Sequence, residues 1–267
     1  MAELVFLKLG GSLITDKTRD ATPRLDVIRR AAREVATALH QRADLQLLLG
    51  HGSGSFGHMP AHRYHVRQGC DDWWGFALTA AAAARLNRLV TDIFLAEGVA
   101  VVSLSPAASA RCRAGSLLEL AVSPIRAALD HGLVPLIYGD VAFDEAQGST
   151  IVSTEELFVH LAPLLSPQRI VLAGEVDGVF TADPQLDPQA ERIPDITADN
   201  LIRIRGVLSG SRGVDVTGGM LSKVFTMHRL TQERPPLRVQ LLSGLLPGHI
   251  AEALLNPASR AGTIIRR

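Results

Sequence analysis

The chain has 267 residues, of which 47% are hydrophobic and 20% are charged, and its 27 basic side chains balance its 27 acidic ones. This composition is ordinary for a globular protein and excludes a disordered tail protein or a fibrous repeat. A net charge of zero provides no global positive field for binding a nucleic-acid backbone, so any anion site has to be local. We therefore expect no nucleic-acid partner.

The two cysteines, Cys70 and Cys112, are too few for a disulfide framework or a four-ligand zinc site. We expect free thiols in a reducing compartment. No stretch approaches the roughly 20 uninterrupted apolar residues that a bilayer span requires, and the N-terminus lacks the basic segment and cleavage site of a signal peptide. The expectation is a cytoplasmic protein without membrane contact.

Short apolar runs alternate with longer amphipathic stretches along the chain, which is typical of strands and helices around a mostly parallel sheet. In chain order we expect a strand over 4–9, a helix over 25–39, a strand over 45–49, a helix from Asp71 or Asp72 to Gly98, a strand over 99–104, a helix over 125–129, a strand over 133–138, a hairpin over 141–153, a helix over 155–164, a strand over 169–173, a helix over 218–230, a strand over 238–242 and a terminal edge strand over 263–265. The pattern indicates an α/β layer fold.

Two glycine-rich turns follow the first two expected strands. The first runs from Lys8 to Ser12 and reads KLGGS, and the second runs from His51 to His58 and reads HGSGSFGH. Ligands of open α/β sheets bind where strands end, and glycines there let backbone N–H groups approach a phosphate because no Cβ intervenes. Two such turns, each with a lysine or histidine, predict a phosphate site. We expect His51 itself to pack or to brace the turn.

The second turn also contains the pattern G-x-G-x-x-G at Gly52, Gly54 and Gly57, so a dinucleotide-binding oxidoreductase has to be considered. That fold requires an amphipathic helix leading to a strand that ends in an acidic residue. Here a polar stretch without an expected helix continues to Gln68, and the aspartates that follow open a helix. The ATP-binding P-loop pattern is absent too, which makes the oxidoreductase the least favoured function.

A third glycine-rich segment runs from Gly210 to Met220, ahead of an expected helix that carries Lys223 near its start. The N-terminal amides of such a helix and the ammonium group of the lysine converge, which suits the phosphates of a nucleotide. A loop with a solvated lysine explains this segment equally well when it is taken alone.

Together these segments resemble the amino acid kinase superfamily and, within it, the isopentenyl phosphate kinases. The match runs in order through residues 8–12 with Asp16 and Lys17, residues 51–58, Gly139 and Asp140, residues 176–179 (VDGV), and residues 215–220 with Lys223. The resemblance implies a three-layer αβα sandwich around a mostly parallel central sheet, as one domain over 1–267. It further implies an acceptor-binding lobe over 1–165, a nucleotide-binding lobe over 166–267, and a homodimer.

The most specific part of the resemblance is the SFGH sequence of residues 55–58, because in isopentenyl phosphate kinases the matching histidine contacts the acceptor phosphate. The implied reaction moves a phosphoryl group from ATP to isopentenyl phosphate. Unit charges of like sign 4 Å apart repel by about 4 kcal/mol at an effective dielectric constant of 20, so several cationic groups are needed. The candidates are Lys8, Lys17, His58 and Lys223.

The resemblance also assigns roles. Lys8 would bridge the donor and acceptor phosphates, Lys17 would stabilise the transition state, and Lys223 would hold the ATP tail. The amides that would cradle the transferring phosphoryl group belong to Gly10, Gly11, Ser12 and Gly54. The other expected ATP contacts are Leu9, Glu175, Gly218 and Gly219, and the expected substrate contacts are Ser53, Gly57, His58, Thr154, Trp74 and Phe76. His58 would be the group most sensitive to pH.

The chain departs from the family pattern in three places. Ser53 stands where three consecutive glycines are common, and a serine still leaves a backbone amide to donate. Residues 153–156 read STEE where many relatives have SGDD, so Glu155 reaches one methylene further than the aspartate that orients the catalytic lysines. Glu175 stands where relatives often have an aspartate beside the nucleotide.

An isoprenoid tail needs an apolar slot beside the phosphate site, because its burial returns roughly 25 cal/mol per Å². Trp73, Trp74 and Phe76 follow the acceptor turn, and both tryptophans of the chain lie here. In the family, the helix that starts at this point walls the tail pocket. Plain core packing explains each of these residues equally well, and the sequence leaves the depth of the pocket open.

Two alternatives to an isopentenyl phosphate kinase stay open. A fosfomycin-kinase-like phosphonate kinase would share these turns but would not need the aromatic residues. A non-catalytic nucleotide or metabolite sensor would not need all four cationic candidates. The resemblance implies ATP and Mg²⁺ as cofactors, with Mg²⁺ bound mainly by ATP phosphates and water, so we expect no carboxylate cage for a metal.

Overall fold

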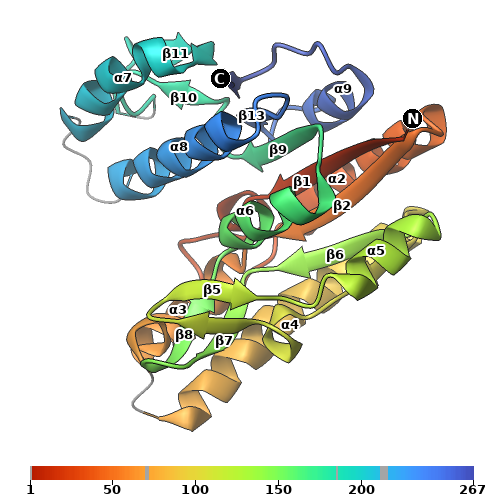
Figure 1. Ribbon diagram of the computed structural model, residues 1–267, viewed down its shortest axis with the longest axis vertical. Helices are drawn as coiled ribbons and strands as arrows, with labels where there is room; N and C mark the ends of the chain where they lie inside the picture. The colour runs from red at the N-terminus through yellow and green to blue at the C-terminus, as the bar shows by residue number, and fades with distance from the viewer. Residues whose placement is uncertain (1, 70–71, 185, 211–215) are drawn as a thin grey trace.

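The computed structural model describes the chain except for residues 1, 70–71, 185 and 211–215. Its centre is a sheet of eight strands in the order β12-β14-β13-β9-β1-β2-β6-β3 (Figure 1). Their bounds are β1 Glu3–Leu9, β2 Leu45–His51, β3 Val101–Ser103, β6 Val134–Tyr138, β9 Arg169–Gly174, β12 Asp195–Ile196, β13 Arg238–Ser243 and β14 Thr263–Ile265. All neighbours run parallel except β13 and β14, so the mostly parallel sheet is confirmed.

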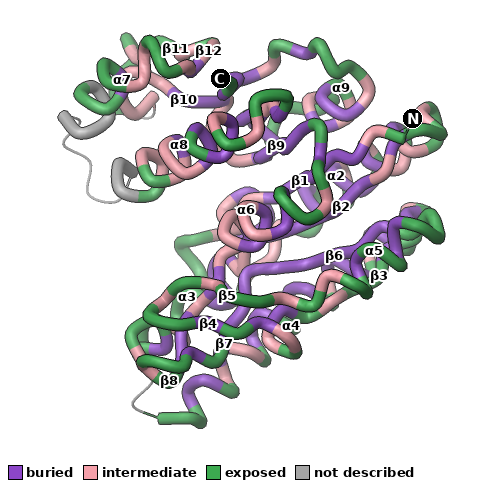
Figure 2. Tube along the Cα trace, viewed as in Figure 1, coloured by how far each residue is buried: buried purple, intermediate pink, exposed green. Residues whose placement is uncertain are grey.

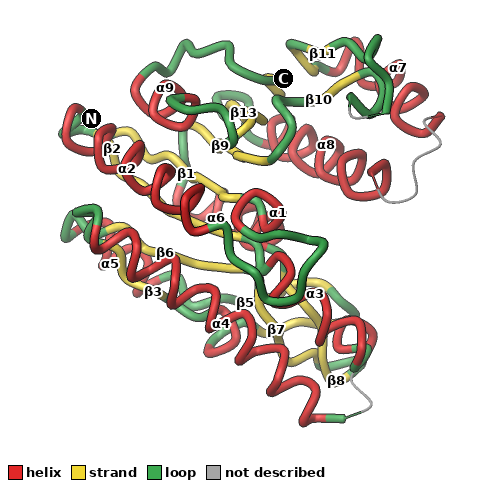
Figure 3. Tube along the Cα trace, turned by 180° about the vertical axis from the view of Figure 1, so that it is seen from behind, coloured by secondary structure: helices red, strands yellow, loops and turns green. Residues whose placement is uncertain are grey.

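Helices cover both faces of this sheet, which confirms the three layers (Figures 1 and 3). One face carries α1 (Gly11–Ile14), α2 (Leu25–Gln41), α4 (Trp73–Ala96) and α9 (His249–Leu255). The other carries α5 (Ser123–Asp130), α6 (Thr154–Leu165), α7 (Ala198–Gly210) and α8 (Val216–Glu233). Side chains of β1 alternate between the two cores, with Leu7 in the first and Phe6 in the second. Figure 2 shows β1 buried along most of its length, and a strand covered on both faces in this way is apolar at nearly every position.

The strand register aligns the carboxyl ends of five strands at one edge of the sheet. Leu9 of β1 pairs with His51 of β2 and with Ala173 of β9. In the next strands outward, Tyr138 of β6 pairs with His51, and Leu242 of β13 pairs with Ala173. The turns that leave these strands consequently lie next to one another, although they are far apart in the sequence.

A second sheet, in the order β5-β4-β7-β8, lies beside the central one. It consists of β4 (Arg111–Arg113), β5 (Ser116–Glu119), β7 (Asp140–Asp144) and β8 (Gly148–Val152). β7 and β8 form the expected antiparallel hairpin. β4 and β5 were not expected, because strands this short show no clear alternation. The remaining elements are α3 (Gly54–Arg63), the pair β10 (Val179–Phe180) and β11 (Arg192–Ile193), and the 3₁₀ turns η1 (Val66–Gln68) and η2 (Pro106–Ala108).

Two expectations were wrong. The segment after Gly57 belongs to a helix, α3. This helix was not predicted because it contains two glycines and Pro60 and its apolar residues do not recur at helical spacing. α3 leads through η1 into α4 and not into a strand, so the requirement of the dinucleotide-binding fold is not met. The terminal strand β14 is not an edge strand, because the two-residue strand β12 pairs with its outer side.

Other local expectations are confirmed. The carboxylate of Asp72 caps α4 by accepting from the Trp74 amide at 2.8 Å, whereas Asp71 lies outside the described residues. Cys112 is a buried free thiol, and Cys70 also lies outside the described residues. Across the described part of the chain, no helix combines the length and the apolar character needed to cross a bilayer.

Candidate active site

A cavity of about 440 Å³ opens at the carboxyl edge of the central sheet. Its walls come from the ends of β1, β2, β9 and β13 and from the starts of α1, α3, α6 and α8. The predicted site residues that line it are Lys8, Gly10, Gly11, Ser12, Lys17, Ser53, Gly54, His58, Thr154, Glu175, Gly219 and Lys223. Segments that are more than 200 residues apart in the sequence thus share one cavity.

The two glycine-rich turns pack backbone against backbone at the centre of this cavity. A Cβ on Gly11 would lie 2.6 Å from the amide nitrogen of Gly54, and a Cβ on Gly52 would lie 2.7 Å from the amide nitrogen of Gly11. Gly54 has a φ of +50°, which favours glycine. Side chains at these positions would force the turns apart, so glycine here allows the backbone N–H groups of both turns to reach one space.

Thr15 joins the two turns, and the sequence offered no motif that singles it out. Its hydroxyl donates to the carbonyl oxygen of Gly11 at 2.7 Å and accepts from the amide of Ser55 at 3.0 Å. The side chain is fully buried. Thr15 therefore ties the end of α1 to the first turn of α3, whose N-terminal amides face an anion favourably.

Glu155 lies between two of the four predicted cationic residues, Lys8 and Lys223. Its Oε2 forms an ion pair with the Lys8 ammonium, and its Oε1 lies 3.5 Å from Lys223 Nζ. The side chains of Lys8 and Glu155 are only 10% and 16% exposed. The extra methylene of glutamate, compared with aspartate, thus reaches both lysines from the start of α6.

Burial and charge shift the pKa values of this triad. Burial lowers the pKa of Lys8, while the Glu155 carboxylate opposes that shift. Burial by itself would raise the pKa of Glu155, but the ammonium groups of Lys8 and then Lys223 outweigh it and hold the pKa at about 2. Glu155 is therefore ionised at neutral pH, and its charge favours the charged form of the buried Lys8.

A capping box holds Glu155 in place. The Ser153 hydroxyl accepts from the Glu156 amide at 3.1 Å, and the Glu156 carboxylate accepts from the Ser153 amide at 2.6 Å. Thr154, a predicted substrate contact, donates its hydroxyl proton to the carbonyl oxygen of His51 at 2.6 Å. Its hydroxyl thus braces the end of β2 against α6.

Glu175, a predicted ATP contact, lines the cavity and forms an ion pair of 2.8 Å with Arg24. Arg24 directly precedes α2 and was not predicted, because no local pattern connects it to residue 175. The pair ties the chain that enters α2 to the end of β9 at the mouth of the cavity.

Four cationic side chains line the cavity, namely Lys8, Lys17, Arg67 and Lys223, against the two carboxylates Glu155 and Glu175. Arg67, which is exposed on η1, was not predicted from the sequence. This local excess of positive charge, in a chain with no net charge, suits an anionic ligand with several phosphates.

Four predicted residues, Leu9, Gly57, Trp74 and Phe76, are not among the described residues that line the cavity. Leu9 is fully buried, and Gly57 packs against the Ser53 side chain. Gly218 lies in the first turn of α8, and residues 211–215 of the third glycine-rich segment lie outside the described part. Trp74 is 66% exposed. Phe76 forms a buried cluster with Val66 and Val141. Ile151 packs against this cluster and lines the cavity.

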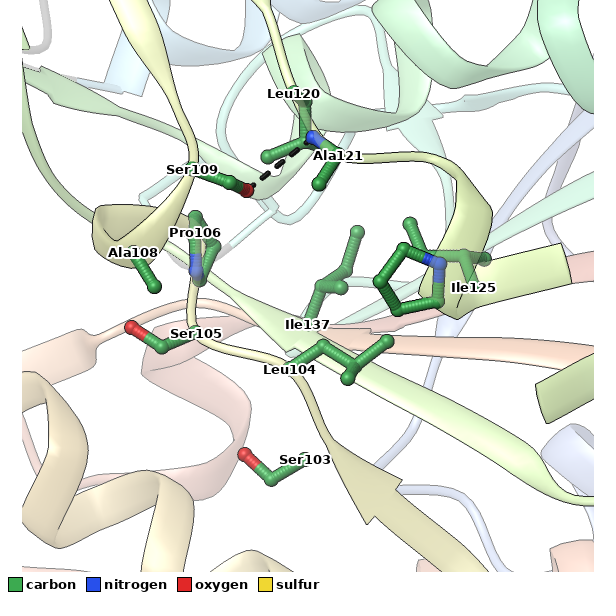
Figure 4. Close-up of a pocket in the computed structure, with 11 residues that line it drawn as sticks. Ser103, Leu104, Ser105, Pro106, Ala108, Ser109, Leu120, Ala121, Ile125 and Ile137 are labelled. Atoms are coloured by element: carbon green, nitrogen blue, oxygen red, sulfur yellow. Dashed lines mark hydrogen bonds between the residues drawn. The ribbon is translucent and has the colours of Figure 1, made fainter. Parts of the chain in front are cut away.

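A second cavity, of about 230 Å³, lies beside β6 (Figure 4). Leu104, Ile125 and Ile137 supply apolar walls, and at its edge the Ser109 hydroxyl accepts from the Ala121 amide at 3.2 Å. None of its lining residues is charged. It offers no cation to a phosphate, so the cavity at the carboxyl edge of the central sheet, which holds the predicted residues, is the candidate active site.

Comparisons with known proteins show the family to which the chain belongs. The sequence profile of the amino acid kinase family matches residues 3–240. The isopentenyl phosphate kinase of Methanothermobacter thermautotrophicus is 34% identical over 98% of each chain, and that of Methanocaldococcus jannaschii is 33% identical over 85% of this chain and 87% of its own.

Solved structures give the same result. An X-ray structure of an isopentenyl phosphate kinase matches with a TM-score of 0.83 and 32% identity, covering 98% of this chain and 99% of its own. The product complex of the T. acidophilum isopentenyl phosphate kinase matches with a TM-score of 0.78 and 27% identity, covering 98% of this chain and all of its own. The chain therefore belongs to the amino acid kinase family and, within it, to the isopentenyl phosphate kinases.

Proposed function

We propose that this chain transfers the γ-phosphoryl group of ATP to isopentenyl phosphate and forms isopentenyl diphosphate and ADP. The observation that carries the proposal is the meeting of the two glycine turns, the Lys8–Glu155–Lys223 triad and His58 in one cavity. The relatives named above, which match over nearly the whole chain, support the choice of acceptor.

In this proposal the two phosphates approach from opposite sides of Lys8. Ser53 and His58 hold the acceptor phosphate at the start of α3, and Lys223 with the start of α8 holds the ATP tail. An oxygen of the acceptor phosphate attacks the γ-phosphorus, and the bond from that phosphorus to the β–γ bridging oxygen breaks, so ADP leaves with the electron pair. Lys8 and Lys17 offset the charge that accumulates between the anions.

No general base is required for this step. The second pKa of a phosphate monoester is about 6, so the acceptor is largely ionised at pH 7 and has no proton to lose. Glu155, with a pKa of about 2, would be a poor base in any case. We therefore assign Glu155 to holding Lys8 and Lys223 and not to proton transfer.

The donor set fits a Mg²⁺ ion that arrives with the nucleotide. Both oxygens of Glu155 face ammonium groups, and the described residues contain no group of three His, Cys, Asp or Glu side chains suited to a metal. Backbone amides and lysines of the cavity would hold the phosphates that carry the ion. When bound, Mg²⁺ supplies further neutralisation of phosphate charge.

An apolar surface for the isoprenoid tail adjoins the acceptor side. Ile151 of β8 lines the cavity, and Phe76, Val66 and Val141 pack behind it. Phe76 would therefore shape the tail slot from behind Ile151. We propose that residues 1–165 supply this acceptor half and residues 166–267 the nucleotide half.

ATP consumption with a panel of acceptors tests the proposal. The panel contains isopentenyl, dimethylallyl and geranyl phosphates, fosfomycin, acetylglutamate and UMP. Isopentenyl phosphate should give the highest kcat/KM. Turnover of fosfomycin, acetylglutamate or UMP without turnover of isopentenyl phosphate would refute it. Two further expectations from the resemblance, a homodimer and a cytoplasmic location, stay predictions that light scattering and cell fractionation can check.

A further inference from the structure

His51, the last residue of β2, stands directly before the second glycine turn and is fully buried. Its ring stacks on Tyr138 of the neighbouring strand β6, with 5.5 Å between the ring centroids and 8° between the ring planes. The ring cannot swing away without disturbing the packing between two central strands. The imidazole is thus held where the chain turns from β2 into α3.

Both ring nitrogens of His51 have hydrogen-bonding neighbours. Nδ1 lies 3.0 Å from the carbonyl oxygen of Gly52, and Nε2 lies 3.1 Å from Nδ2 of Asn87. A carbonyl oxygen can only accept, so Nδ1 must donate, and a neutral ring must then accept at Nε2. The Asn87 side-chain oxygen in turn accepts from the Ser103 hydroxyl, which orients the amide. Burial lowers the pKa of His51 to about 4, so the ring is neutral at pH 7.

The hydrogen bond to Gly52 orients a peptide plane that borders the cavity. The C=O of Gly52 and the N–H of Ser53 belong to one planar trans peptide and point in opposite directions. Because the carbonyl faces the buried ring, the Ser53 N–H faces away from that ring, and Ser53 lines the cavity. The first glycine turn packs against this segment, since a Cβ on Gly52 would lie 2.7 Å from the Gly11 amide nitrogen.

The preceding peptide plane is held as well. The carbonyl oxygen of His51 accepts from the Thr154 hydroxyl at 2.6 Å and from the Gly139 amide at 3.0 Å. The end of β2 is therefore anchored by these two hydrogen bonds. The imidazole of His51 adds to them by fixing the orientation of the next peptide group, between Gly52 and Ser53.

We propose that His51 is a positioning residue for the acceptor phosphate: its Nδ1–H holds the Gly52 carbonyl inside the protein and so presents the Ser53 N–H to the anion, while Asn87 selects the tautomer. The inference rests on the proposed function only in taking that anion to be the acceptor. A phosphate monoester gains a preorganised amide donor in this way.

Two substitutions at the same position separate this role from core packing. In His51→Asn, the side-chain nitrogen branches from the chain where Nδ1 does and can still donate to the Gly52 carbonyl, whereas His51→Leu keeps bulk and loses the donor. We expect KM for the acceptor to rise about tenfold in His51→Leu and to stay within about threefold of wild type in His51→Asn, with KM for ATP unchanged in both. Equal acceptor KM values in the two variants would overturn the proposal.

NMR of protein with ¹⁵N-labelled histidine checks the tautomer without reference to activity. The His51 ring should show a protonated Nδ1 and an unprotonated Nε2 from pH 6 to pH 8, and the reverse tautomer would overturn the proposal. If the wild type phosphorylates no acceptor of the panel, the proposed function fails while this inference is still decided. The affinity of the same variants for inorganic phosphate, measured by calorimetry, then replaces KM, and equal affinities would count against it.

Discussion

The most informative substitution is Glu155→Gln, because it removes the only negative charge between Lys8 and Lys223 in the described triad and keeps the shape of the side chain. At 3.5 Å, the attraction between Glu155 and Lys223 alone is about 5 kcal/mol at an effective dielectric constant of 20, before the cost of desolvation. Loss of one partner from a buried ion pair costs about 3–5 kcal/mol. Lys223 is 31% exposed and partly screened, so we expect about 3 kcal/mol.

For a chain of this length, that loss of unfolding free energy corresponds to a decrease in Tm of about 6–12 °C. We also expect kcat to fall about a hundredfold, because the lysines lose the group that aims them at the phosphates. ATP should raise the Tm of the variant more than that of the wild type, since its phosphates replace the missing charge. Differential scanning fluorimetry with and without ATP, together with initial rates, measures all three effects.

Glu156→Gln is the matched control. It makes the same chemical change one residue further along, and glutamine can still accept in the capping box. This variant should keep the wild-type Tm within about 2 °C and kcat within about twofold. Equal Tm and kcat values for Glu155→Gln and Glu156→Gln would refute the conclusion that the Glu155 carboxylate holds the two lysines in place.

Further substitutions, with one control outside the site, test the remaining contacts separately. Lys223→Met should raise KM for ATP about tenfold in initial-rate assays, and an unchanged ATP dependence would place the nucleotide clamp elsewhere. His58→Ala should lower kcat/KM for the acceptor about a hundredfold at an unchanged Tm, whereas a near-normal value would remove His58 from the acceptor site. Gly54→Ala places a Cβ 2.6 Å from a carbonyl oxygen of the first glycine turn at a positive φ, and should cost about 3 kcal/mol in urea denaturation. Gly98 also has a positive φ, but a Cβ added there would have no atom within 4 Å, so Gly98→Ala should cost only about 1 kcal/mol. Equal losses of unfolding free energy in the two variants would contradict the close packing of the glycine turns. Because burial lowers the pKa of His51 from 6.5 to about 4, its contribution to stability is complete above pH 6.5 and is lost as the pH falls to 4. The difference in unfolding free energy between wild type and His51→Asn should therefore shrink by about 3 kcal/mol over that window, and parallel curves would refute the shift.

Much of the fold could be predicted from the local pattern of apolar and polar residues. A strand buried on both faces has to be apolar along its length, and residues 4–9, 45–49, 133–138, 169–173 and 238–242 were recognised for that reason. The helix over residues 54–63 was missed, because its glycines and proline oppose the helical prediction and tertiary packing outweighs them. The short strands β4, β5 and β12 were not predicted, because their two to four residues show no clear alternation of apolar and polar side chains.

The residues that join distant segments were the hardest to find. Thr15, Arg24 and Arg67 belong to no motif, and each is recognisable only by its neighbours in space. Trp74, in contrast, was singled out by its position in the sequence but does not line the cavity. Its position just after the acceptor turn suggested a substrate contact, but α4 places it at the surface with 66% exposure, while Ile151 of a later hairpin supplies the apolar wall.

By itself, the sequence determined the kind of chemistry, because glycine turns at strand ends and the lysines beside them are local features whose spacing along the chain is enough to identify an anion site. Only the tertiary structure decided how the charges are arranged. The register of parallel strands brings β1 and β9 together, and helices on the same face add residues 155 and 223. An interaction that falls off with distance in space cannot be deduced from separation along the chain, and so the ion pairs of Glu155 became visible only once the chain was folded.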